Sequence, residues 1–453
     1  MLDQIISHKY QVIKQREAEI NSYKNLVKPS QKSMLEALKK HRRSYICEIK
    51  LASPSSGVIR KDVDISSIGR IYAPFADAMS VLAEDKYFMG SNNNVRKISQ
   101  EQACPVLYKD FIVSPLQVFE ARYFGADAVL LMLSVLDDKT YQACEKIARA
   151  LNMSVLCETH NEEEVLRANK LGAQIIGINN RNLANLQIDL DAARRLRPLV
   201  HDKALVIAES GFVNHQQIQS YDNLVDGFLI GTSLMRAPRI DLALRELIFG
   251  RVKICGLTNA HDARLAYDLG AYYGGLNFSP TSKRQISLAE AKNIISNASL
   301  SFGGVFVNQP IDEVLHIAQE LRLDFVQLHG DEAKDYIREL RRLLSPDCEI
   351  WQALRIKNTY TPDNSNADLI LLDTYKPESY GGTGEAFNWS LCKNYAGRKF
   401  GLAGGINSHN IRQASNYNPF LLDMASGAED GDFRQKSSKK LQEIFATLRG
   451  EIS

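Results

Sequence analysis

The sequence predicts an α/β fold made of two tandem (β/α)8 TIM barrels, the first with an extra N-terminal helical segment. The chain has 453 residues, which is too long for one ordinary domain. Short apolar runs recur about every 20–30 residues with amphipathic segments between them, which is typical of a parallel sheet buried on both faces. Eight such runs are followed by a second set of eight. Eight βα units in some 200 residues fit a barrel better than an open sheet.

The N-terminal segment has a different texture from the rest of the chain. Ile5, Tyr10 and Ile13 recur at helical spacing among Lys, Gln and Glu. Pro29 marks a break, and a short helical pattern resumes over 33–41. We expect this segment to precede the first barrel strand.

The apolar runs predict the strands of both barrels. In the first half they are Tyr45–Ile49, Met79–Leu82, Val106–Tyr108, Ala128–Leu133, Ser154–Cys157, Ile175–Ile178, Leu205–Ala208 and Gly227–Ile230. In the second half they are Arg251–Ile254, Tyr273–Phe278, Gly304–Val307, Phe325–Gln327, Ile350–Ala353, Leu369–Leu372, Lys399–Ala403 and Phe420–Met424. The boundary near Gly250 predicts domains 1–249 and 250–453. One α/β domain with sixteen strands is the alternative.

The composition excludes several classes of protein. A net charge of +2 argues against a nucleic-acid partner, and the most apolar stretch, Ala128–Leu136, is about half of what spans a bilayer. The N-terminus lacks the apolar core of a signal peptide. The seven cysteines are dispersed and form no C-x-x-C pair, which favours a reducing cytoplasm and argues against a metal site. We expect a cytoplasmic protein without a membrane partner.

Polar residues follow the strands of the first half. Because active sites of such barrels lie at the C-terminal strand ends, we expect these side chains to converge on one mouth, where crowded charges shift each other's pKa for acid–base work. They are Glu48, Lys50, Lys109, Glu158, Asn179, Arg181, Glu209 and Ser210. The small residues after strands seven and eight leave backbone N–H groups for a phosphate, which predicts a phosphorylated small-molecule substrate; they are Gly211, Gly231 and Thr232.

The second half repeats this plan with different residues. Cys255 lies at the end of the first strand, where a cysteine is usually only a small buried apolar side chain. Lys253, in phase beneath it, is a cation that would instead favour the thiolate. Asp373 ends the sixth strand, so a thiol and a carboxyl face each other as base and acid. Arg284 is a candidate clamp for a substrate carboxylate. The small residues after strands seven and eight are Gly404, Gly405, Ser426 and Gly427.

Two further features have more than one interpretation, and a third has a simple one. His329, at a strand end, is either a structural histidine or a substrate contact. The glycine-rich segment Tyr380–Trp389 is either a loop that folds over the substrate or only a flexible turn. The lysine run 436–440 is most simply the solvated start of a helix.

Long motifs in both halves resemble known families. The first half resembles indole-3-glycerol-phosphate synthase in EIKLASPSSGVIR (48–60), YKDFIVSPLQ (108–117), GINNRNL (177–183), AESGF (208–212) and FLIGTSLM (228–235). The second half resembles phosphoribosylanthranilate isomerase in VKICGLT (252–258), SPTSKR (279–284), GVFVN (304–308), VQLHGDE (326–332), LLDTY (371–375) and GGTGEAFNW (381–389). Their order resembles the fused bifunctional enzymes of bacterial tryptophan biosynthesis, and the resemblance covers nearly the whole chain.

For the first barrel the resemblance implies closure of an indole ring on a carboxyphenylamino-deoxyribulose 5-phosphate, with loss of carbon dioxide and water. Lys109 would be the general acid and Glu158 would assist the dehydration, while Lys50 would lie near the substrate carboxylate and phosphate. The polar ring would be completed by Glu48, Asn179, Arg181, Glu209 and Ser210, and the phosphate would lie against Ser53, Gly211, Gly231 and Thr232.

For the second barrel the resemblance implies an Amadori rearrangement of phosphoribosylanthranilate to the same ketose. Asp373 would protonate the ribose ring oxygen, Cys255 would remove the proton from C2, and Arg284 would hold the anthranilate carboxylate. The phosphate would lie against Gly404, Gly405, Ser426 and Gly427. Neither reaction requires a metal or an organic cofactor, and we expect a monomer.

Three positions depart from the family patterns, and three alternatives for the function stay open. Leu51 and Ser56 stand where lysines are usual, and Ala425 where serine is common; none removes an acid or a base. One alternative is an aldolase with a Schiff base on Lys109. The second is a sugar-phosphate-binding regulator with dead sites, and the third is a fusion in which one barrel is inactive.

Overall fold

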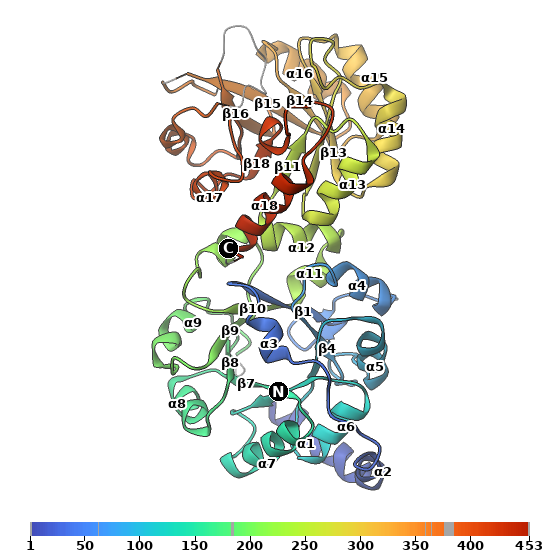
Figure 1. Ribbon diagram of the computed structural model, residues 1–453, viewed down its shortest axis with the longest axis vertical. Coiled ribbons are helices and arrows are strands. Elements are labelled where there is room, and N and C mark those ends of the chain that lie inside the picture. Colours follow the sequence, from blue (N-terminus) through green and yellow to red (C-terminus); the bar gives the residue numbers. More distant parts are fainter. Residues whose placement is uncertain are drawn as a thin grey trace. The chain divides into compact units, whose positions relative to one another are not determined.

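The chain forms two closed parallel barrels, and the computed structural model describes residues 2–61, 63–182, 185–357, 359–363, 365–375 and 385–451. The contacts divide them into two compact units, one extending to Leu244 and including Glu451, the other Arg245–Gly450. The division falls within helix α12 (Ile240–Phe249). One barrel lies in each unit (Figure 1). The predicted fold class is confirmed, and the alternative of one sixteen-stranded domain is wrong.

The first barrel has the strand order β1-β10-β9-β8-β7-β6-β5-β4, and all neighbouring strands are parallel. The strands are β1 (Ser44–Ile49), β4 (Ala78–Leu82), β5 (Val106–Lys109), β6 (Ala128–Met132), β7 (Ser154–Thr159), β8 (Ile175–Asn179), β9 (Leu205–Glu209) and β10 (Gly227–Ile230). A small antiparallel pair, β2 (Ala52–Ser53) and β3 (Gly57–Val58), follows β1.

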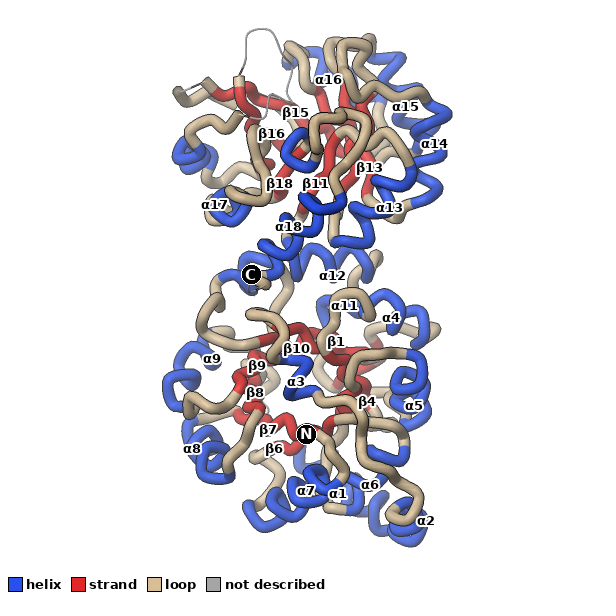
Figure 2. The backbone as a smooth tube through the Cα atoms, in the orientation of Figure 1, coloured by secondary structure: helices blue, strands red, loops and turns tan. Residues whose placement is uncertain are grey.

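Helices surround this barrel, as the red strands and blue helices of Figure 2 show. They are α1 (Leu2–Gln15), α2 (Glu17–Tyr23), α3 (Met34–Leu38), α4 (Ile65–Tyr72), α5 (Asn92–Glu101), α6 (Leu116–Tyr123), α7 (Asp138–Ala150), α8 (Glu162–Leu171), α9 (Asp191–Leu196) with the 3-10 turn η1 (Arg197–Leu199), α10 (His215–Gln219) and α11 (Thr232–Arg236).

Side-chain caps explain where several helices begin. Asp137 accepts hydrogen bonds at the start of α7, and Asn161 does so at the start of α8. Such caps satisfy backbone N–H groups that have no partner within the helix. Helix α8 ends at Gly172 in the left-handed conformation, with φ 72°.

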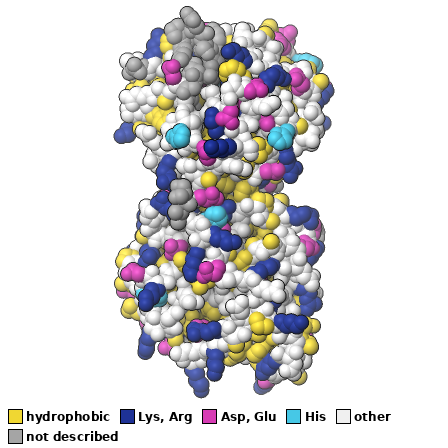
Figure 3. Space-filling model, viewed as in Figure 1, with side chains coloured by type: hydrophobic (Ala, Val, Ile, Leu, Met, Phe, Trp, Pro, Cys, Tyr) yellow, Lys and Arg dark blue, Asp and Glu magenta, His cyan; other side chains and the backbone are white. Residues whose placement is uncertain are grey.

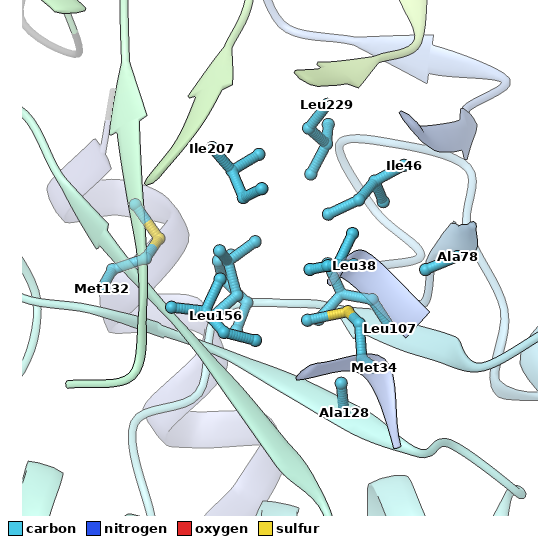
Figure 4. Close-up of a cluster of buried hydrophobic side chains, with 12 residues drawn as sticks. Met34, Leu38, Ile46, Ala78, Leu107, Ala128, Met132, Leu156, Ile207 and Leu229 are labelled. Carbon is cyan, nitrogen blue, oxygen red and sulfur yellow. The ribbon is translucent and has the colours of Figure 1, made fainter. Parts of the chain in front are cut away.

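Helix α3, the last helix of the predicted N-terminal segment, closes the floor of the first barrel, which is the end where its strands begin. Met34 and Leu38 of α3 pack against side chains near the strand starts, including Ile46 and Ala78 (Figure 4). Met34 is 0% exposed. The polar residues lie at the opposite end of the barrel, where the strands end. Helix α3 therefore covers the end away from the predicted active site.

Helix α1 is tied to a strand end that carries a predicted catalytic residue. The Nζ of Lys9 lies 2.9 Å from Oδ1 of Asp110, and both side chains are buried. Asp110 directly follows Lys109, the last residue of β5. A second buried carboxylate, Glu120 in α6, lies 2.7 Å from Arg16. The N-terminal segment therefore fixes the backbone around Lys109 from outside the barrel.

The second barrel closes in simple sequence order from β11 to β18, and its strands are parallel. The strands are β11 (Val252–Cys255), β12 (Tyr273–Asn277), β13 (Ser301–Phe306), β14 (Phe325–Leu328), β15 (Glu349–Ile356), β16 (Leu369–Thr374), β17 (Phe400–Leu402) and β18 (Leu421–Met424). The helices are α13 (Ala260–Leu269), α14 (Leu288–Asn297), α15 (Ile311–Leu321), α16 (Lys334–Leu343), α17 (Ile411–Ser415) and α18 (Ser438–Arg449), with the 3-10 turns η2 (Trp389–Tyr395) and η3 (Ser426–Ala428).

An aromatic cluster fills the second barrel near the ends where its strands begin. Phe325 and Trp351 stack with ring centroids 3.6 Å apart, and Tyr273 meets Trp351 edge-on at 5.1 Å. Trp351 is 0% exposed. These bulky rings leave the C-terminal strand ends as the place where a substrate can enter.

The surface of each unit mixes both signs of charge. On the face drawn in Figure 3, Lys and Arg side chains are interspersed with Asp and Glu over both units. None of the helices in the described ranges is long and apolar enough to cross a membrane.

Candidate active sites

The first barrel brings its predicted polar residues together at the C-terminal strand ends. Glu48 lies in β1, Lys109 in β5, Glu158 in β7, Asn179 in β8 and Glu209 in β9. The three glutamates are buried, with 1–3% of each residue exposed. Four of the five belong to one connected network of contacts, so the predicted convergence on one mouth is observed.

Lys109 is the centre of this network. Its Nζ lies 3.2 Å from Oε2 of Glu158 and 3.2 Å from Oε2 of Glu209. Burial alone would lower the pKa of Lys109, but the charges of Glu209 and Glu158 outweigh it and raise the pKa above its ordinary value. The amine is therefore held as an ammonium. A Schiff-base lysine must lose that proton, so the aldolase alternative is disfavoured.

The two carboxylates beside Lys109 have opposite pKa shifts. Burial raises the pKa of Glu158, but Lys109 and His160 outweigh it and lower the pKa. Burial also raises the pKa of Glu209, Lys109 lowers it, and the repulsion of Glu158 helps to bring it to about 7. The pair therefore holds one carboxylate firmly charged and one that binds a proton near neutral pH, a division suited to acid–base work.

Two glycines make room for the buried glutamates. A Cβ on Gly177 in β8 would collide with Oε1 of Glu209. A Cβ on Gly231, which follows β10, would lie 2.6 Å from Oε1 of Glu48. Glu48 itself accepts a hydrogen bond of 3.3 Å from Ser80. The glycines are thus needed for the neighbouring carboxylates.

Glu48 and Lys50 point to the same side of the chain, as their spacing predicts. The Nζ of Lys50 lies 2.7 Å from Oε1 of Glu48. Burial raises the pKa of Glu48, but Lys50 and Lys109 outweigh it and lower the pKa. Lys50 is therefore paired with Glu48 inside the barrel mouth.

The structure brings a residue that was not predicted, His160, to the same network. Its Nε2 lies 3.2 Å from Oε1 of Glu158 and its Nδ1 3.2 Å from Oε2 of Glu164. His160 Nε2 is close enough to Glu158 for an ion pair, but the two groups are not aligned for a hydrogen bond. Burial lowers the pKa of His160, but the two carboxylates outweigh it and raise the pKa to about 10. The signal was present in the spacing, since His160 follows Glu158 by two residues.

Asn179 and Arg181 play different parts in the structure. Asn179 Nδ2 donates to Oε1 of Glu158 at 3.2 Å. Arg181 directs Nη1 to the backbone carbonyl of Leu186 at 2.9 Å, within its own loop. Asn179 therefore joins the charged network. The Arg181 backbone N–H donates to Oδ1 of Asn179 at 3.0 Å, but its guanidinium contacts its own loop.

The predicted phosphate residues follow three neighbouring strands. Ser53 lies after β1, Gly211 after β9, and Gly231 and Thr232 after β10, and these strands are adjacent in the order β9-β10-β1. Ser210 and Gly211 both have positive φ, at 67° and 95°. The turn after β9 is thus held in a conformation that favours glycine.

We expect Glu209 to make the first barrel less stable as pH rises from about 4.5 to about 7. The folded state holds the Glu209 proton more tightly than the unfolded state, so this contribution is full below the ordinary pKa and is lost through the raised one. A Glu209→Gln variant should lack this loss, which we expect to be on the order of 1–3 kcal/mol. Urea unfolding followed by circular dichroism at pH 5 and pH 7.5 measures it.

The matched control is Glu162→Gln, since Glu162 is an exposed glutamate at the start of α8. Its stability should follow the wild type at both pH values. If Glu209→Gln kept the wild-type dependence on pH, the raised pKa of Glu209 would be refuted.

The second barrel contains a cavity of about 510 Å³ at its C-terminal strand ends. Every residue predicted for this site lines it: Cys255, Arg284, Asp373, Gly404, Gly405, Ser426 and Gly427. Its wall also includes Gln327, His329, Asp423 and Phe433. The volume suits a small phosphorylated molecule.

Lys253 lies beneath Cys255 as its phase predicts. The Nζ of Lys253 is fully buried and donates to Oδ2 of Asp423 at 2.8 Å and to Oε1 of Gln327 at 2.7 Å. Burial raises the pKa of the Cys255 thiol, Lys253 lowers it, and Asp423 raises it. Lys253 thus shifts the pKa of the thiol in the predicted direction. Burial and Asp423 outweigh it, so the pKa of the Cys255 thiol lies above its ordinary value.

We expect Lys253→Met to shift the pH–rate profile of the second barrel to higher pH, because the thiolate of Cys255 loses its stabilising cation. Asp423→Asn should shift the profile to lower pH, because it removes a repelling carboxylate. Thiolate absorbance during a pH titration, together with kcat at each pH, measures both shifts. Lys253→Met/Asp423→Asn keeps the buried pair neutral and serves as the folding control. Unchanged profiles in both single variants would rule out the effect.

A hydrogen-bonded chain connects Lys253 to Asp373. Gln327 Nε2 lies 2.8 Å from Nδ1 of His329, and His329 Nε2 lies 3.1 Å from Oδ2 of Asp373. The Thr374 backbone N–H donates to the other carboxylate oxygen at 2.8 Å. His329 therefore orients Asp373 and also lines the cavity, so both interpretations of this histidine are compatible with the structure.

Arg284 reaches the cavity while bound to a carboxylate of the same chain. Its Nε and Nη2 donate to Glu429 at 2.8 and 2.7 Å. Lys436 Nζ also binds Glu429. Lys436 is 7% exposed, so the prediction of a solvated lysine there is wrong: Glu429 draws the side chain inward, and α18 begins only at Ser438.

The turns after β17 and β18 require glycine. Gly404 and Gly405 have φ of 80° and 69°, and a Cβ on Gly427 would collide with the carbonyl of Ile406. The two predicted phosphate loops therefore pack closely together. Much of the glycine-rich segment 380–389 lies outside the described residues, since the structure describes the chain only to 375 and again from 385.

Family models match both units. Indole-3-glycerol phosphate synthase matches residues 2–247, and N-(5'-phosphoribosyl)anthranilate isomerase matches residues 252–447. A solved phosphoribosyl anthranilate isomerase from Thermus thermophilus is 35% identical, with a TM-score of 0.40, and covers 44% of this chain and 98% of that one.

Relatives match the chain along its length. A tryptophan biosynthesis protein TrpCF from Vibrio parahaemolyticus is 42% identical over 99% of this chain and 94% of its own. The protein of the same name from Buchnera aphidicola subsp. Diuraphis noxia is 42% identical over 99% of each. The chain therefore belongs to the indole-3-glycerol phosphate synthase family in its first barrel, to the phosphoribosylanthranilate isomerase family in its second, and as a whole to the bifunctional TrpCF family of tryptophan biosynthesis enzymes.

Proposed function

We propose that residues 250–453 isomerise phosphoribosylanthranilate and that residues 1–249 close the indole ring on the product, each with the site residues described above. The observation that carries the synthase site is the Nζ of Lys109 held 3.2 Å from two buried carboxylates of unlike pKa. For the isomerase site it is one cavity lined by Cys255, Asp373 and two small-residue loops.

In the synthase barrel, the ammonium of Lys109 is the general acid that donates to the ketose carbonyl as the ring closes. A preorganised cation stabilises an alkoxide as its charge develops. Glu158 then assists the dehydration as an acid–base group beside the departing hydroxyl. Asn179 Nδ2 donates to Glu158 at 3.2 Å and orients its carboxylate. Glu209, with its raised pKa, can exchange a proton with Lys109 between the steps.

The rest of the synthase site binds the ends of the substrate. Lys50 and Glu48 stand on the β1 side of the mouth, where Lys50 faces the carboxylate that is lost. Arg181 and Ser210 contact the substrate. The phosphate lies against small residues that follow adjacent strands: Ser53, Gly211, Gly231 and Thr232.

In the isomerase barrel, Asp373 protonates the ribose ring oxygen and opens the ring to a Schiff base. Cys255 then takes the proton from C2 as its thiolate, which Lys253 stabilises from below. Arg284 holds the anthranilate carboxylate, and the phosphate lies against Gly404, Gly405, Ser426 and Gly427.

The test follows fresh phosphoribosylanthranilate with the full chain. Loss of its fluorescence, followed by growth of indole absorbance, is the expected result. Fluorescence loss without indole would mean an inactive synthase barrel. No change in either signal would overturn the isomerase proposal, and the ketose would then be supplied directly to judge the synthase.

The protein is proposed to work as a cytoplasmic monomer without metal or organic cofactor. Seven dispersed cysteines suit a reducing compartment, and both reactions use only acids and bases of the chain. Sedimentation at micromolar concentration tests the monomer, and activity after treatment with a chelator tests the independence from metal.

A further inference from the structure

Three buried side chains form a cluster behind the cavity wall of the second barrel. Glu429 follows η3, and its two carboxylate oxygens accept hydrogen bonds from Arg284 Nε and Nη2. Lys436 shares one of these oxygens. Only 11% of the Arg284 side chain, 3% of that of Glu429 and 1% of that of Lys436 are exposed. Arg284 alone of the three lines the cavity.

The cluster carries one positive charge in excess. Two cations share one carboxylate, and a buried charge that is not balanced is costly. The electrostatics of Lys436 reflect this. Burial lowers its pKa, Glu429 opposes the shift, and the positive charge of Arg284 adds to the lowering. One further carboxylate would balance the cluster.

The geometry leaves Arg284 able to bind that carboxylate. A guanidinium has five N–H donors, and Glu429 takes one from Nε and one from Nη2. The ring of Phe433, which also lines the cavity, lies 5.0 Å from the Arg284 guanidinium carbon. Glu429 and Phe433 thus fix the plane of the guanidinium while its remaining donors serve the cavity side.

We propose that Lys436 determines the specificity of the isomerase barrel for a substrate with an aromatic carboxylate, acting through Glu429 on Arg284. If Glu429 faced Arg284 alone, the pair would be neutral and would attract the substrate carboxylate weakly. Lys436 offsets the charge of Glu429, so that Arg284 keeps both its fixed orientation and its attraction for an anion. The proposal rests on the proposed role of Arg284, and Lys436 is a positioning residue that does not touch the substrate.

The test compares two substrates in the full chain: phosphoribosylanthranilate, and phosphoribosylaniline, which lacks the carboxylate. Lys436→Met should raise KM for the first about tenfold, because an attraction across a buried cluster is lost. Lys436 also lowers the pKa of the Cys255 thiol, so any change in kcat should be the same for both substrates. KM for the second should not change. Lys436→Arg should behave as the wild type with both substrates. Lys439→Met, a change of an exposed lysine three residues away, is the matched control.

A double variant separates charge from structure. Lys436→Met/Glu429→Gln restores one excess positive charge, carried by Arg284, so KM for phosphoribosylanthranilate should return to within about threefold of the wild type. A further rise in KM, or an equal rise for both substrates in Lys436→Met, would overturn the proposal and leave a structural role.

Arg284→Leu distinguishes failure of this inference from failure of the proposed function. It should remove the preference for the carboxylate-bearing substrate. If Arg284→Leu removes the preference and Lys436→Met does not change it, only the inference about Lys436 fails. If neither variant changes it, the carboxylate is bound elsewhere and the role of Arg284 fails as well.

Discussion

Replacement of Lys109 by alanine is expected to lower synthase kcat about 10³-fold while isomerase kinetics stay at the wild-type level. The variant removes the only cation within 3.2 Å of both Glu158 and Glu209 among the described residues, so the ketose carbonyl loses its acid. It also leaves two buried carboxylates facing each other, which should raise the pKa of at least one of them. Indole formation from the ketose, measured across pH 5 to 9, checks both effects.

Two variants make the Lys109 result interpretable. Lys170→Ala changes an exposed lysine in the same barrel and should leave kcat unaltered. Glu158→Gln should also lower synthase kcat, and it preserves the volume of the side chain. Synthase activity within tenfold of the wild type in Lys109→Ala would mean that another group is the acid.

Replacement of Asp373 by asparagine, or of Cys255 by alanine, is expected to lower isomerase kcat about 10³-fold or more and to spare the synthase. Asparagine keeps the size of Asp373 and its contact with the Thr374 N–H, but it has no proton to give to the ring oxygen. Alanine at position 255 removes the group that takes the C2 proton. Disappearance of phosphoribosylanthranilate fluorescence measures the first reaction, and the ketose supplied directly measures the second.

The control for Cys255 is Cys348→Ala, which removes another buried cysteine of the second barrel that does not line the cavity. Its kinetics should match the wild type. Full isomerase activity in Cys255→Ala would refute the assignment of the base, and full activity in Asp373→Asn would refute that of the acid.

The strands, and the convergence of polar side chains on each barrel mouth, were predictable because each depends on local patterns. Apolar runs mark strands buried on both faces, and side chains two residues apart on a strand share a side. Glu48 and Lys50 satisfy that rule with a contact of 2.7 Å. The glycines near the phosphate loops were also visible in the sequence, although only the structure shows that Gly177 makes room for Glu209.

Contacts between distant parts of the chain could not be predicted. Arg284 and Glu429 are 145 residues apart, and Lys9 and Asp110 are 101 apart. Neither Glu429 nor Lys436 stands at a strand end, so no rule about barrels selects them. Their importance comes from burial, and a charged residue near a helix start usually remains in water. For the same reason the run 436–440 looked like a solvated helix start.

The floor of the first barrel has a consequence for synthesis of the chain. Met34 and Leu38 leave the ribosome early, but their packing partners extend to Leu229 in β10. At about 5–20 residues per second, those partners follow roughly ten to forty seconds later. During that interval the early partners, such as Ile46 and Ala78, can cover the apolar face of α3 only in part. A nascent chain stalled before β10 therefore exposes apolar surface at the end of an incomplete barrel. That surface makes the chain prone to aggregation and proteolysis.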